Sequence, residues 1–505
     1  MSPAEAPQDP IGQPATAERG GPRPSQRIAS AAFARGVGEV VAKLASLVFF
    51  VAIARELGEE QFGEFIFGLS FSTVLMVLAG FGLEELIARE VAKDRREVDE
   101  LLWNVVVLKA LMVCFLLVVI AVTITIQGYS LDARLAILVI SAGVGFDYET
   151  NALFAVFQGY ERQQHVATSL IVNRISTAAF GIGVLVAGGG LVLVAIVFTL
   201  GSALGVGTAY ALLRRYVVRF RHYVDVRAWW GLVRAGFPLG VLGFLGVISL
   251  RSSVVLLGFL GAGSVVVGQY GAAFRLIEAT LFVPWSFSNA VLPWFSRHPG
   301  SGPISVARGL EMSLKAILAV MLPVALGLAL FAGPVVETVY GPDYGGAAAP
   351  LRVLAAMALL VGINAVITAV LIGRDQPRVY TVPAAVAIVT TLVLSFVLIP
   401  AHGGIGAAVT AVASGAVLAV LSIAVTTHLV GSISTLRVVV APLAAGASMA
   451  LVAIALSGAP WVGAAVISTV VYGAAFLAIE RILFPGDFAY YSNILPFRDA
   501  RQGQT

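Results

Sequence analysis

The stretch Trp103–Ile126, WNVVVLKALMVCFLLVVIAVTITI, decides the class of fold. It contains a single charge, Lys109, and no proline or glycine. A helix needs roughly 20 mostly apolar residues to cross about 30 Å of hydrocarbon, so this stretch predicts a membrane-spanning helix. The strict alternation of apolar and polar residues that a porin-like barrel requires is absent.

The whole chain shares this apolar composition. Of its 505 residues, 59% are hydrophobic and 12% are charged, whereas soluble domains carry about 25% charged residues. So few charges cannot cover the surface of a soluble protein of this length. The composition excludes a soluble enzyme, a disordered protein and a nucleic-acid-binding protein.

Apolar stretches of similar length recur along the chain between short polar segments. We therefore predict an all-α integral membrane protein with about fourteen transmembrane helices. Residues 1–27, rich in Pro, Gln and Gly, predict a disordered cytoplasmic tail, and residues 485–505 a second cytoplasmic tail. The predicted spans are residues 33–54, 65–87, 103–126, 132–157, 167–187, 190–213, 235–257, 264–295, 309–331, 350–372, 379–399, 404–427, 435–456 and 461–483.

The basic residues predict the orientation of these spans. With the N-terminus in the cytoplasm, 24 of the 32 Lys and Arg residues fall inside, three fall outside and five lie within spans. The three outside are Arg55, Arg134 and Arg352. An excess of cations marks cytoplasmic loops. We expect a multi-pass protein of the cell membrane with both termini in the cytoplasm, and this topology accounts for the net charge of +4 without a nucleic-acid partner.

The chain also repeats itself. A shift of 214 residues aligns Ala155-Val156-x-x-Gly159-x-Glu161 with Ala369-Val370-x-x-Gly373-x-Asp375, and Gly189-Gly190-Leu191 with Gly403-Gly404-Ile405. A looser match sets Leu57-Gly58 and Phe62-Gly63-x-Phe65 against Leu257-Gly258 and Val267-Gly268-x-Tyr270. These repeats predict two pseudo-symmetric six-helix lobes, residues 28–213 and 235–430. A cytoplasmic basic linker, 214–234, joins them, and residues 431–484 add a further helix pair.

We assign nine charged residues to the interior of the predicted spans, where a charge is costly and faces a cavity or a partner. Arginine offers paired donors to phosphate, so the cations predict a cavity between the lobes that binds an anionic group. The alternative is that Glu39–Lys43 and Arg275–Glu278 are pairs that only hold helices together. The candidate substrate-binding cations are Lys43, Lys109, Arg174, Arg251 and Arg275, and the candidate coupling or pairing acids are Glu39, Asp147, Glu149 and Glu278.

Other sequence features predict no catalytic residue, metal site or cofactor. The single cysteine, Cys114, excludes an internal disulfide, and Gly188-Gly189-Gly190 lacks the Lys-Ser/Thr of a nucleotide-binding loop. Glu84 and Glu85 are interpreted as the solvated end of a span. Pro284, Pro323 and Pro383 are expected to kink their helices, and Trp285 is a candidate for stacking on a sugar.

Several short motifs then follow one another in a specific order. They are Ala54-Arg55-Glu56-Leu57-Gly58, Gln61-Phe62-Gly63-Glu64-Phe65, Phe157-Gln158-Gly159-Tyr160-Glu161-Arg162, Gly236-Phe237-Pro238-Leu239, Val267-Gly268-Gln269-Tyr270-Gly271-Ala272-Ala273, Val339-Tyr340-Gly341-Pro342-Asp343-Tyr344 and Gly404-Ile405-Gly406-Ala407-Ala408. Over residues 28–430 this order resembles the Wzx-like polysaccharide flippases of the multidrug/oligosaccharidyl-lipid/polysaccharide exporter superfamily. One departure is Arg251-Ser252-Ser253-Val254, where many members have an acidic residue; it argues against cation coupling at that position.

The resemblance implies a flippase rather than an enzyme. Such a protein moves a polyprenyl-(di)phosphate-linked oligosaccharide from the cytoplasmic to the outer leaflet by alternating access, for surface glycan synthesis. Its partners would be this substrate and membrane lipids, with a functional link to glycosyltransferases and a polymerase or ligase. One alternative is a cation-coupled multidrug (MATE-like) exporter of the same superfamily. Another is a membrane-bound glycan-polymerising enzyme, for which the predicted outer loops are short.

Overall fold

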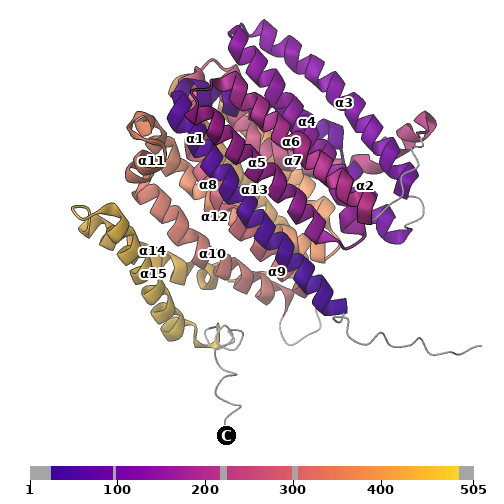
Figure 1. Ribbon diagram of the computed structural model, residues 1–505. Helices are drawn as coiled ribbons and strands as arrows, with labels where there is room; N and C mark the ends of the chain where they lie inside the picture. Colours follow the sequence, from indigo (N-terminus) through magenta and orange to yellow (C-terminus); the bar gives the residue numbers. More distant parts are fainter. Residues whose placement is uncertain (1–23, 95–97, 217–223, 298–304, 488–505) are drawn as a thin grey trace, which may run out of the picture.

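The computed structural model describes residues 24–94, 98–216, 224–297 and 305–487, and all regular structure in these ranges is helical (Figure 1). The helices are α1 (Pro24–Gly80), α2 (Leu83–Lys93), α3 (Val98–Ile126), α4 (Leu131–Gly159), α5 (Gln163–Val186), α6 (Leu191–Tyr216), α7 (Trp229–Phe259), α8 (Ser264–Thr280), α9 (Phe282–Arg297), α10 (Val306–Leu330), α11 (Ala332–Tyr340), α12 (Ala348–Gly373), α13 (Thr381–Val430), α14 (Thr435–Ala455) and α15 (Trp461–Leu483). Short 3-10 helices lie at η1 (Val226–Ala228), η2 (Pro342–Ala347) and η3 (Pro377–Tyr380).

Many of these helices suit a membrane. Within the described residues, eight are long and apolar enough to cross one, or up to ten if each of two bent pairs counts as a span. The bent pairs are Gly38–Gly80 with Leu83–Lys93, at 41°, and Val226–Pro238 with Gly243–Phe259, at 68°. The predicted all-α membrane class is confirmed. The count of fourteen spans and the two-lobe layout stay predictions.

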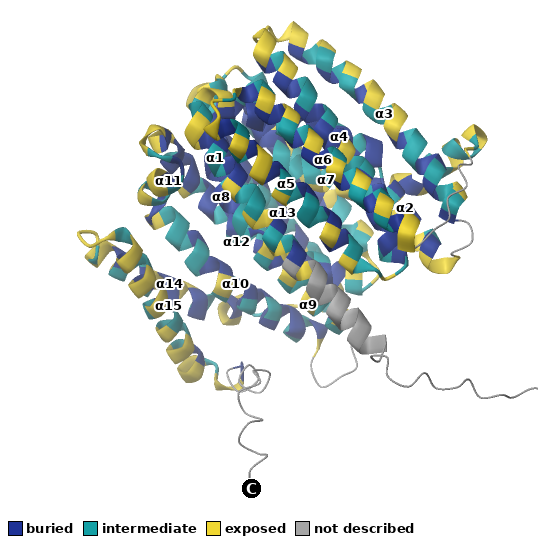
Figure 2. Ribbon diagram, viewed as in Figure 1, coloured by how far each residue is buried: buried dark blue, intermediate teal, exposed yellow. Residues whose placement is uncertain are grey.

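The edges of the bundle are apolar where they face outward. α3 lies at one edge and the α14–α15 pair at the opposite edge, beside α10 (Figure 1). Leu111, Phe115 and Val118 on α3 are more than half exposed, as are Val466 and Val470 on α15 (Figure 2). Contiguous exposed apolar surface is rare on soluble monomers. In a bilayer the same side chains contact hydrocarbon.

Two long helices are divided by glycines. α1 breaks at Gly58, with φ 76° and ψ 177°, and α13 breaks at Gly403, with φ 53° and ψ −127°. Positive φ favours glycine because it has no Cβ. Near the second break, a Cβ on Gly406 would lie 2.1 Å from the Leu398 carbonyl oxygen, so the chain folds back closely on itself there.

The 214-residue repeat has a matching backbone geometry. α4 ends in a turn in which Glu161 has φ 59°, and α12 ends in a turn in which Asp375 has φ 56°. The Arg162 N–H donates to the Phe157 carbonyl at 2.8 Å, and the Gln376 N–H donates to the Leu371 carbonyl at 2.8 Å. Both are Schellman-type helix ends with an acidic residue in the left-handed position. The aligned segments therefore fold alike locally.

The looser repeat needs a correction. The structural counterpart of Gly58 is Gly263, which has φ 84° at the start of α8, and not Gly258, which lies inside α7. Five residues beyond these two glycines stand Gly63 and Gly268. Each would clash with the backbone of the other helix if it carried a Cβ: Gly63 at 1.8 Å from the Ser264 oxygen, and Gly268 at 2.1 Å from the Glu59 oxygen. Equivalent glycines of the two halves thus pack against each other.

Three further expectations change. α1 begins at Pro24, so the end of the predicted tail 1–27 is helical; proline suits a first helical turn. In the predicted tail 485–505, Asp487 is buried against α10 instead of free. Pro383 lies in the first turn of α13 and does not kink it, whereas Pro284 follows the break between α8 and α9. Residues 1–23 and 488–505 lie outside the described part.

Candidate functional site

A cavity of about 590 Å³ lies between helices of the first and second halves of the chain. The first half contributes α1, α4, α5 and α6, and the second half contributes α7, α8 and α9. Seven of the nine charged residues predicted inside spans line it: Glu39, Lys43, Asp147, Arg174, Arg251, Arg275 and Glu278. The structure therefore brings together charges that are up to 239 positions apart in sequence numbering, from Glu39 to Glu278.

One carboxylate organises the second-half side of the cavity. Glu278 accepts from Arg251 at 2.6 Å through one oxygen and from Arg275 at 2.7 Å through the other. The Arg275 guanidinium also lies over the Phe50 ring, 3.7 Å from its centroid, so α1 contacts this group too. Two guanidinium groups share one carboxylate, and the triad keeps a net positive charge.

A second pair lies on the first-half side. The Arg174 guanidinium on α5 donates to Asp147 Oδ2 on α4 at 2.9 Å, and Asn173 Nδ2 donates to Asp147 Oδ1 at 3.0 Å. The Arg174 side chain is 27% exposed, so it remains open to the cavity. The aspartate orients the guanidinium while leaving other N–H groups available.

Lys43 on α1 completes the set of cations. It is exposed, and its ammonium lies 5.6 Å from the ring centroid of Trp285 on α9. Four cations and three carboxylates line the cavity, which leaves a net charge of +1. In a site partly shielded from water, a surplus cation attracts an anion more strongly than it would in bulk solvent.

Lys109 and Glu149 do not line this cavity. Lys109 on α3 is fully buried, and it donates to Glu84 Oε1 at 2.6 Å and to the Tyr148 carbonyl at 2.6 Å. Glu84, whose side chain is 25% exposed, is therefore paired with a buried lysine and is not simply the solvated helix end expected from sequence. Both carboxyl oxygens of Glu149 are buried with no hydrogen-bond partner in the described structure. Since Tyr148 lines the cavity, Lys109 supports its wall from behind.

Sequence reasoning left Lys109, Arg174 and Arg251 without partners nearby in the chain. Each has one on another helix, 25 to 27 positions away: Glu84, Asp147 and Glu278 respectively. Within a helix, only neighbours three or four positions apart meet, as Arg275 and Glu278 do. No short-range pattern signals a pair between helices, so these partners were missed.

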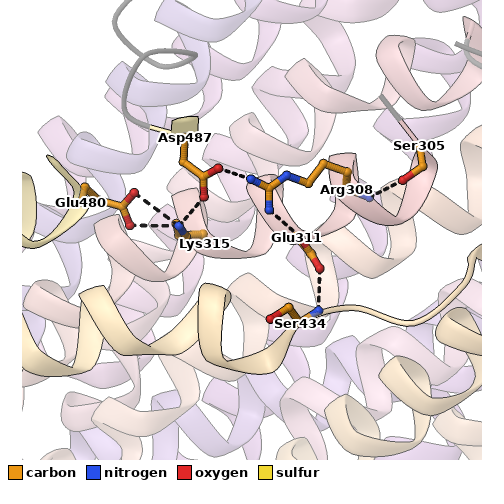
Figure 3. A network of polar contacts seen from close by, with 7 residues as sticks. All are labelled: Ser305, Arg308, Glu311, Lys315, Ser434, Glu480 and Asp487. Carbon is orange, nitrogen blue, oxygen red and sulfur yellow. Dashed lines mark hydrogen bonds and ion pairs between the residues drawn. The ribbon is translucent and has the colours of Figure 1, made fainter. Parts of the chain in front are cut away.

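A second charged network lies outside the cavity, where α10 meets α15 (Figure 3). Lys315 on α10 is 2% exposed and pairs with Glu480 at 3.0 Å and Asp487 at 2.7 Å. Arg308 pairs with Glu311 at 2.6 Å and with Asp487. Glu311 also accepts from the Ser434 N–H just before α14. These contacts join α10 to both α14 and α15, and sequence reasoning missed them as well.

The described residues contain no group of three or more His, Cys, Asp or Glu side chains placed to hold a metal ion. Cys114 is exposed on α3, away from the cavity lining. What the cavity offers chemically is paired guanidinium groups, one ammonium and an aromatic face.

The family described as polysaccharide biosynthesis protein matches residues 29–298, more than half of the chain. The chain belongs to this family. The resemblance expected from sequence is thereby confirmed. The matched region contains all nine candidate charged residues, six in the first half and three on α7 and α8.

Two relatives match the chain at identities of 23% and 32%. A probable low-salt glycan biosynthesis flippase, Agl15 of Haloferax volcanii, is 23% identical over 386 residues, which cover 73% of this chain and 77% of that protein. The EPS I polysaccharide export inner membrane protein EpsE of Ralstonia solanacearum is 32% identical over 97 residues, or 19% of this chain and 22% of that one.

Solved structures show the same fold. The lipid II flippase MurJ, in an inward closed conformation, has a TM-score of 0.71 at 14% identity and covers 89% of this chain and 99% of its own. An inward-facing MATE multidrug transporter of the MOP superfamily has a TM-score of 0.61 at 15% identity, over 76% of this chain and 95% of its own. The fold of this family member is MurJ- and MATE-like.

Four of the family-like motifs meet at one end of the bundle, in what we call the Gly63 contact. It comprises the Gly63–Gly268 packing and the polar bonds beside it. Arg55 donates to the Val339 carbonyl at 2.8 Å, and the Tyr344 hydroxyl donates to the Ala54 carbonyl at 3.0 Å. Because these bonds join the first half to α11 and η2, the motifs close this end between the halves.

A smaller contact, the Gly82 contact, joins the halves just beyond the C-terminal end of α1. A Cβ on Gly82 would lie 2.2 Å from the Gly236 oxygen and 2.4 Å from the Gly240 nitrogen. The Phe81 and Phe237 rings lie 5.2 Å apart between centroids. The motif Gly236-Phe237-Pro238-Leu239 thus meets the bend between α1 and α2.

Proposed function

We propose that this protein is a flippase that moves a polyprenyl-(di)phosphate-linked oligosaccharide from the cytoplasmic to the outer leaflet of the cell membrane. The observation that carries the proposal is the cavity between the two halves, with four cations against three carboxylates. Membership of a polysaccharide biosynthesis family gives the glycan context. Two similar proteins are named flippases, one for a glycan and one for lipid II.

The chemistry of the cavity suits the diphosphate. Guanidinium groups bind phosphate oxygens through paired, charge-assisted hydrogen bonds. Arg174 and Arg251 each hold one carboxylate and retain further N–H donors. The polyprenyl chain would stay in the lipid while the charged group and the sugars pass between the halves.

We propose the fourteen-span arrangement on the lengths of the broken helices. The 50 residues of α13 would extend about 75 Å at 1.5 Å per residue, far more than one crossing of a bilayer. Its break at Gly403 divides it into two arms of crossing length, and Gly58 does the same in α1. With α2 completing the second span and α9 the eighth, the helices would form six spans, six more and a final pair.

The orientation follows from the distribution of cations. With both termini in the cytoplasm, the Gly63 contact closes the outer end of the cavity and the Gly82 contact lies at the cytoplasmic end. Alternating access would open one contact while the other closes, with the lobes moving about the charged cavity. Residues 28–213 and 235–430 would be the moving lobes, and the network of Lys315 would hold the final helix pair to the second.

A MATE-like multidrug exporter is the second candidate, favoured by the shared fold. A cationic drug would meet a cavity that is already positive, and binding would have to overcome that repulsion. We therefore place the lipid-linked glycan first. The protein would act without catalysing a reaction, and would depend on glycosyltransferases for its substrate and on a polymerase or ligase to consume it.

A leaflet assay separates the two candidates. The purified protein is placed in liposomes that contain a prenyl diphosphate carrying one fluorescent sugar, and an impermeant reductant quenches outer-leaflet fluorescence. A flippase exposes the inner-leaflet pool, so quenching rises well beyond the half reached in protein-free liposomes. Quenching that stops at half, together with gradient-driven uptake of ethidium, would reject the flippase and favour the exporter.

A further inference from the structure

A second cavity, of about 340 Å³, adjoins the charged one. It lies within the second half of the chain, between α7, α9, α12 and α13. Leu250 and Trp285 line both cavities, so α7 and α9 form the boundary between them. None of the residues that line the second cavity carries a charged side chain. We call it the neutral cavity.

Four hydroxyls that line the neutral cavity are set up as hydrogen-bond acceptors. Ser249, Thr391 and Ser414 each donate their hydroxyl proton to a carbonyl of their own helix, at 2.8, 3.0 and 3.1 Å. Ser288 on α9 donates to the Ala365 carbonyl on α12 at 2.9 Å. A hydroxyl whose one proton is already donated in this way can only accept a hydrogen bond from a ligand, through its lone pairs.

Asn364 on α12 adds an unsatisfied acceptor to the same wall. Its side chain is 8% exposed, and its Nδ2 donates to the Leu360 carbonyl at 2.9 Å. Its Oδ1 is buried with no partner among the described residues. A buried polar atom without a hydrogen bond is costly. The unpaired Oδ1 of Asn364 therefore indicates that a ligand places a hydrogen-bond donor against this wall.

We propose that the neutral cavity binds the sugar part of the substrate while the charged cavity binds its diphosphate. This inference rests on the proposed flippase function and deepens it. Sugar hydroxyls can donate to these four hydroxyls and to Asn364 and can accept from the Asn289 amide, whereas a phosphate group would find no cationic donor in this cavity. Trp285, more than half exposed at the boundary, offers an aromatic face where the sugar joins the diphosphate.

The same features argue against a hydrocarbon chain in this cavity. An alkyl chain would exclude water from the hydroxyls and from Asn364 and offer them no donor in return. The cavity volume falls within the range of about 300–1,000 Å³ that small-ligand sites occupy. Adjacent charged and neutral cavities thus match the two chemical parts of one molecule.

The test compares binding of two probes to the purified full-length protein in nanodiscs. One probe is a prenyl diphosphate without sugar, and the other is the same lipid carrying one hexose, tried as glucose, galactose and N-acetylglucosamine. Asn364→Leu and Thr391→Val remove polar atoms from the neutral cavity at similar side-chain volume. Thr410→Val, on the same helix but outside both cavities, is the matched control, and thermal unfolding checks that each variant is folded.

We expect the wild type to bind at least one glycosylated probe more tightly than the sugar-free lipid. Asn364→Leu and Thr391→Val should each lower the affinity for that probe about three- to tenfold, which corresponds to the loss of one hydrogen bond. They should change the affinity for the sugar-free lipid less than twofold. Equal wild-type affinity for all probes, or loss of sugar-free binding in these variants, would overturn the proposal; the latter would indicate a lipid chain. Failure of the proposed function itself would look different, because neither probe would bind.

Discussion

Arg251→Gln is the substitution that separates binding from structural support most cleanly. Arg251 shares Glu278 with Arg275, so removing its charge still leaves the carboxylate paired with Arg275 at 2.7 Å. No buried carboxylate is stranded. The cavity lining, however, falls from a net charge of +1 to neutral.

The magnitudes follow from this geometry. Loss of the 2.6 Å bond between Arg251 and Glu278 should cost folding about 1.5 kcal/mol, at the lower end for hydrogen bonds to charged groups. A charge-assisted hydrogen bond to phosphate contributes about 1.5–3 kcal/mol. At about 1.4 kcal/mol per factor of ten, prenyl diphosphate should bind about ten- to a hundredfold more weakly.

The assay is titration of the purified protein in nanodiscs with prenyl diphosphate, at low and high salt. Arg308→Gln is the matched control, because Arg308 is also paired on a helix but lies outside the cavity. The wild-type affinity should fall with added salt, since salt screens partly exposed charges. Wild-type affinity in Arg251→Gln, with normal folding, would refute the assignment of this arginine to the anion.

Three further predictions concern charge and packing. Glu278→Gln leaves two partly buried guanidinium groups without their carboxylate and should destabilise the fold by about 3 kcal/mol in thermal unfolding. Prenyl diphosphate should nevertheless bind more tightly because the cavity becomes more positive, and weaker binding would contradict this. Lys315→Met strands Glu480, whereas Asp487 keeps its pair with Arg308, and should lower stability by a similar amount without a change in that affinity, so an unaltered melting temperature would count against the network. Gly63→Leu cannot keep the backbone contact with α8 and should open the end of the bundle where that contact lies. In a protein that also carries Gln269→Cys and Cys114→Ser, the new cysteine should then react several-fold faster with an impermeant thiol reagent. An unchanged rate would show that the Gly63 contact does not close this end.

The membrane class could be predicted from sequence because each helix that crosses hydrocarbon must itself be apolar. Trp103–Ile126 has to be apolar whatever its neighbours are, so its composition alone identifies it as a span. The 214-residue repeat that aligns Glu161 with Asp375 is also visible in the sequence, because a helix end is made by a few consecutive residues.

The site was predicted only as a set of charges. Seven of the nine residues meet in one cavity because buried charges gather where helices leave space. Their partners could not be predicted: Lys109 pairs with Glu84 through the packing of α2 against α3, and nothing within either helix records that packing. Lys109 and Arg174 have equivalent sequence patterns, yet one supports the wall and the other faces the cavity.

The neutral cavity could not be predicted from sequence either. Ser, Thr and Asn within an apolar helix satisfy themselves on their own backbone, so they give no sequence signal of a site. Only the arrangement of α7, α9, α12 and α13 gathers them around one volume. Trp285 could be named from sequence because a large aromatic residue beside a helix break stands out.

The central claim is that the anionic group crosses through the cavity between the two halves, and photo-crosslinking tests it most directly. A prenyl diphosphate with a photoreactive group next to its phosphates is irradiated with the wild-type protein, and the labelled peptides are mapped by mass spectrometry. The account predicts labels on the segments of α1, α5, α7 and α8 around Lys43, Arg174, Arg251 and Arg275, lost on competition with unlabelled lipid. Labels confined to the outward faces of α3 and α15 would contradict it.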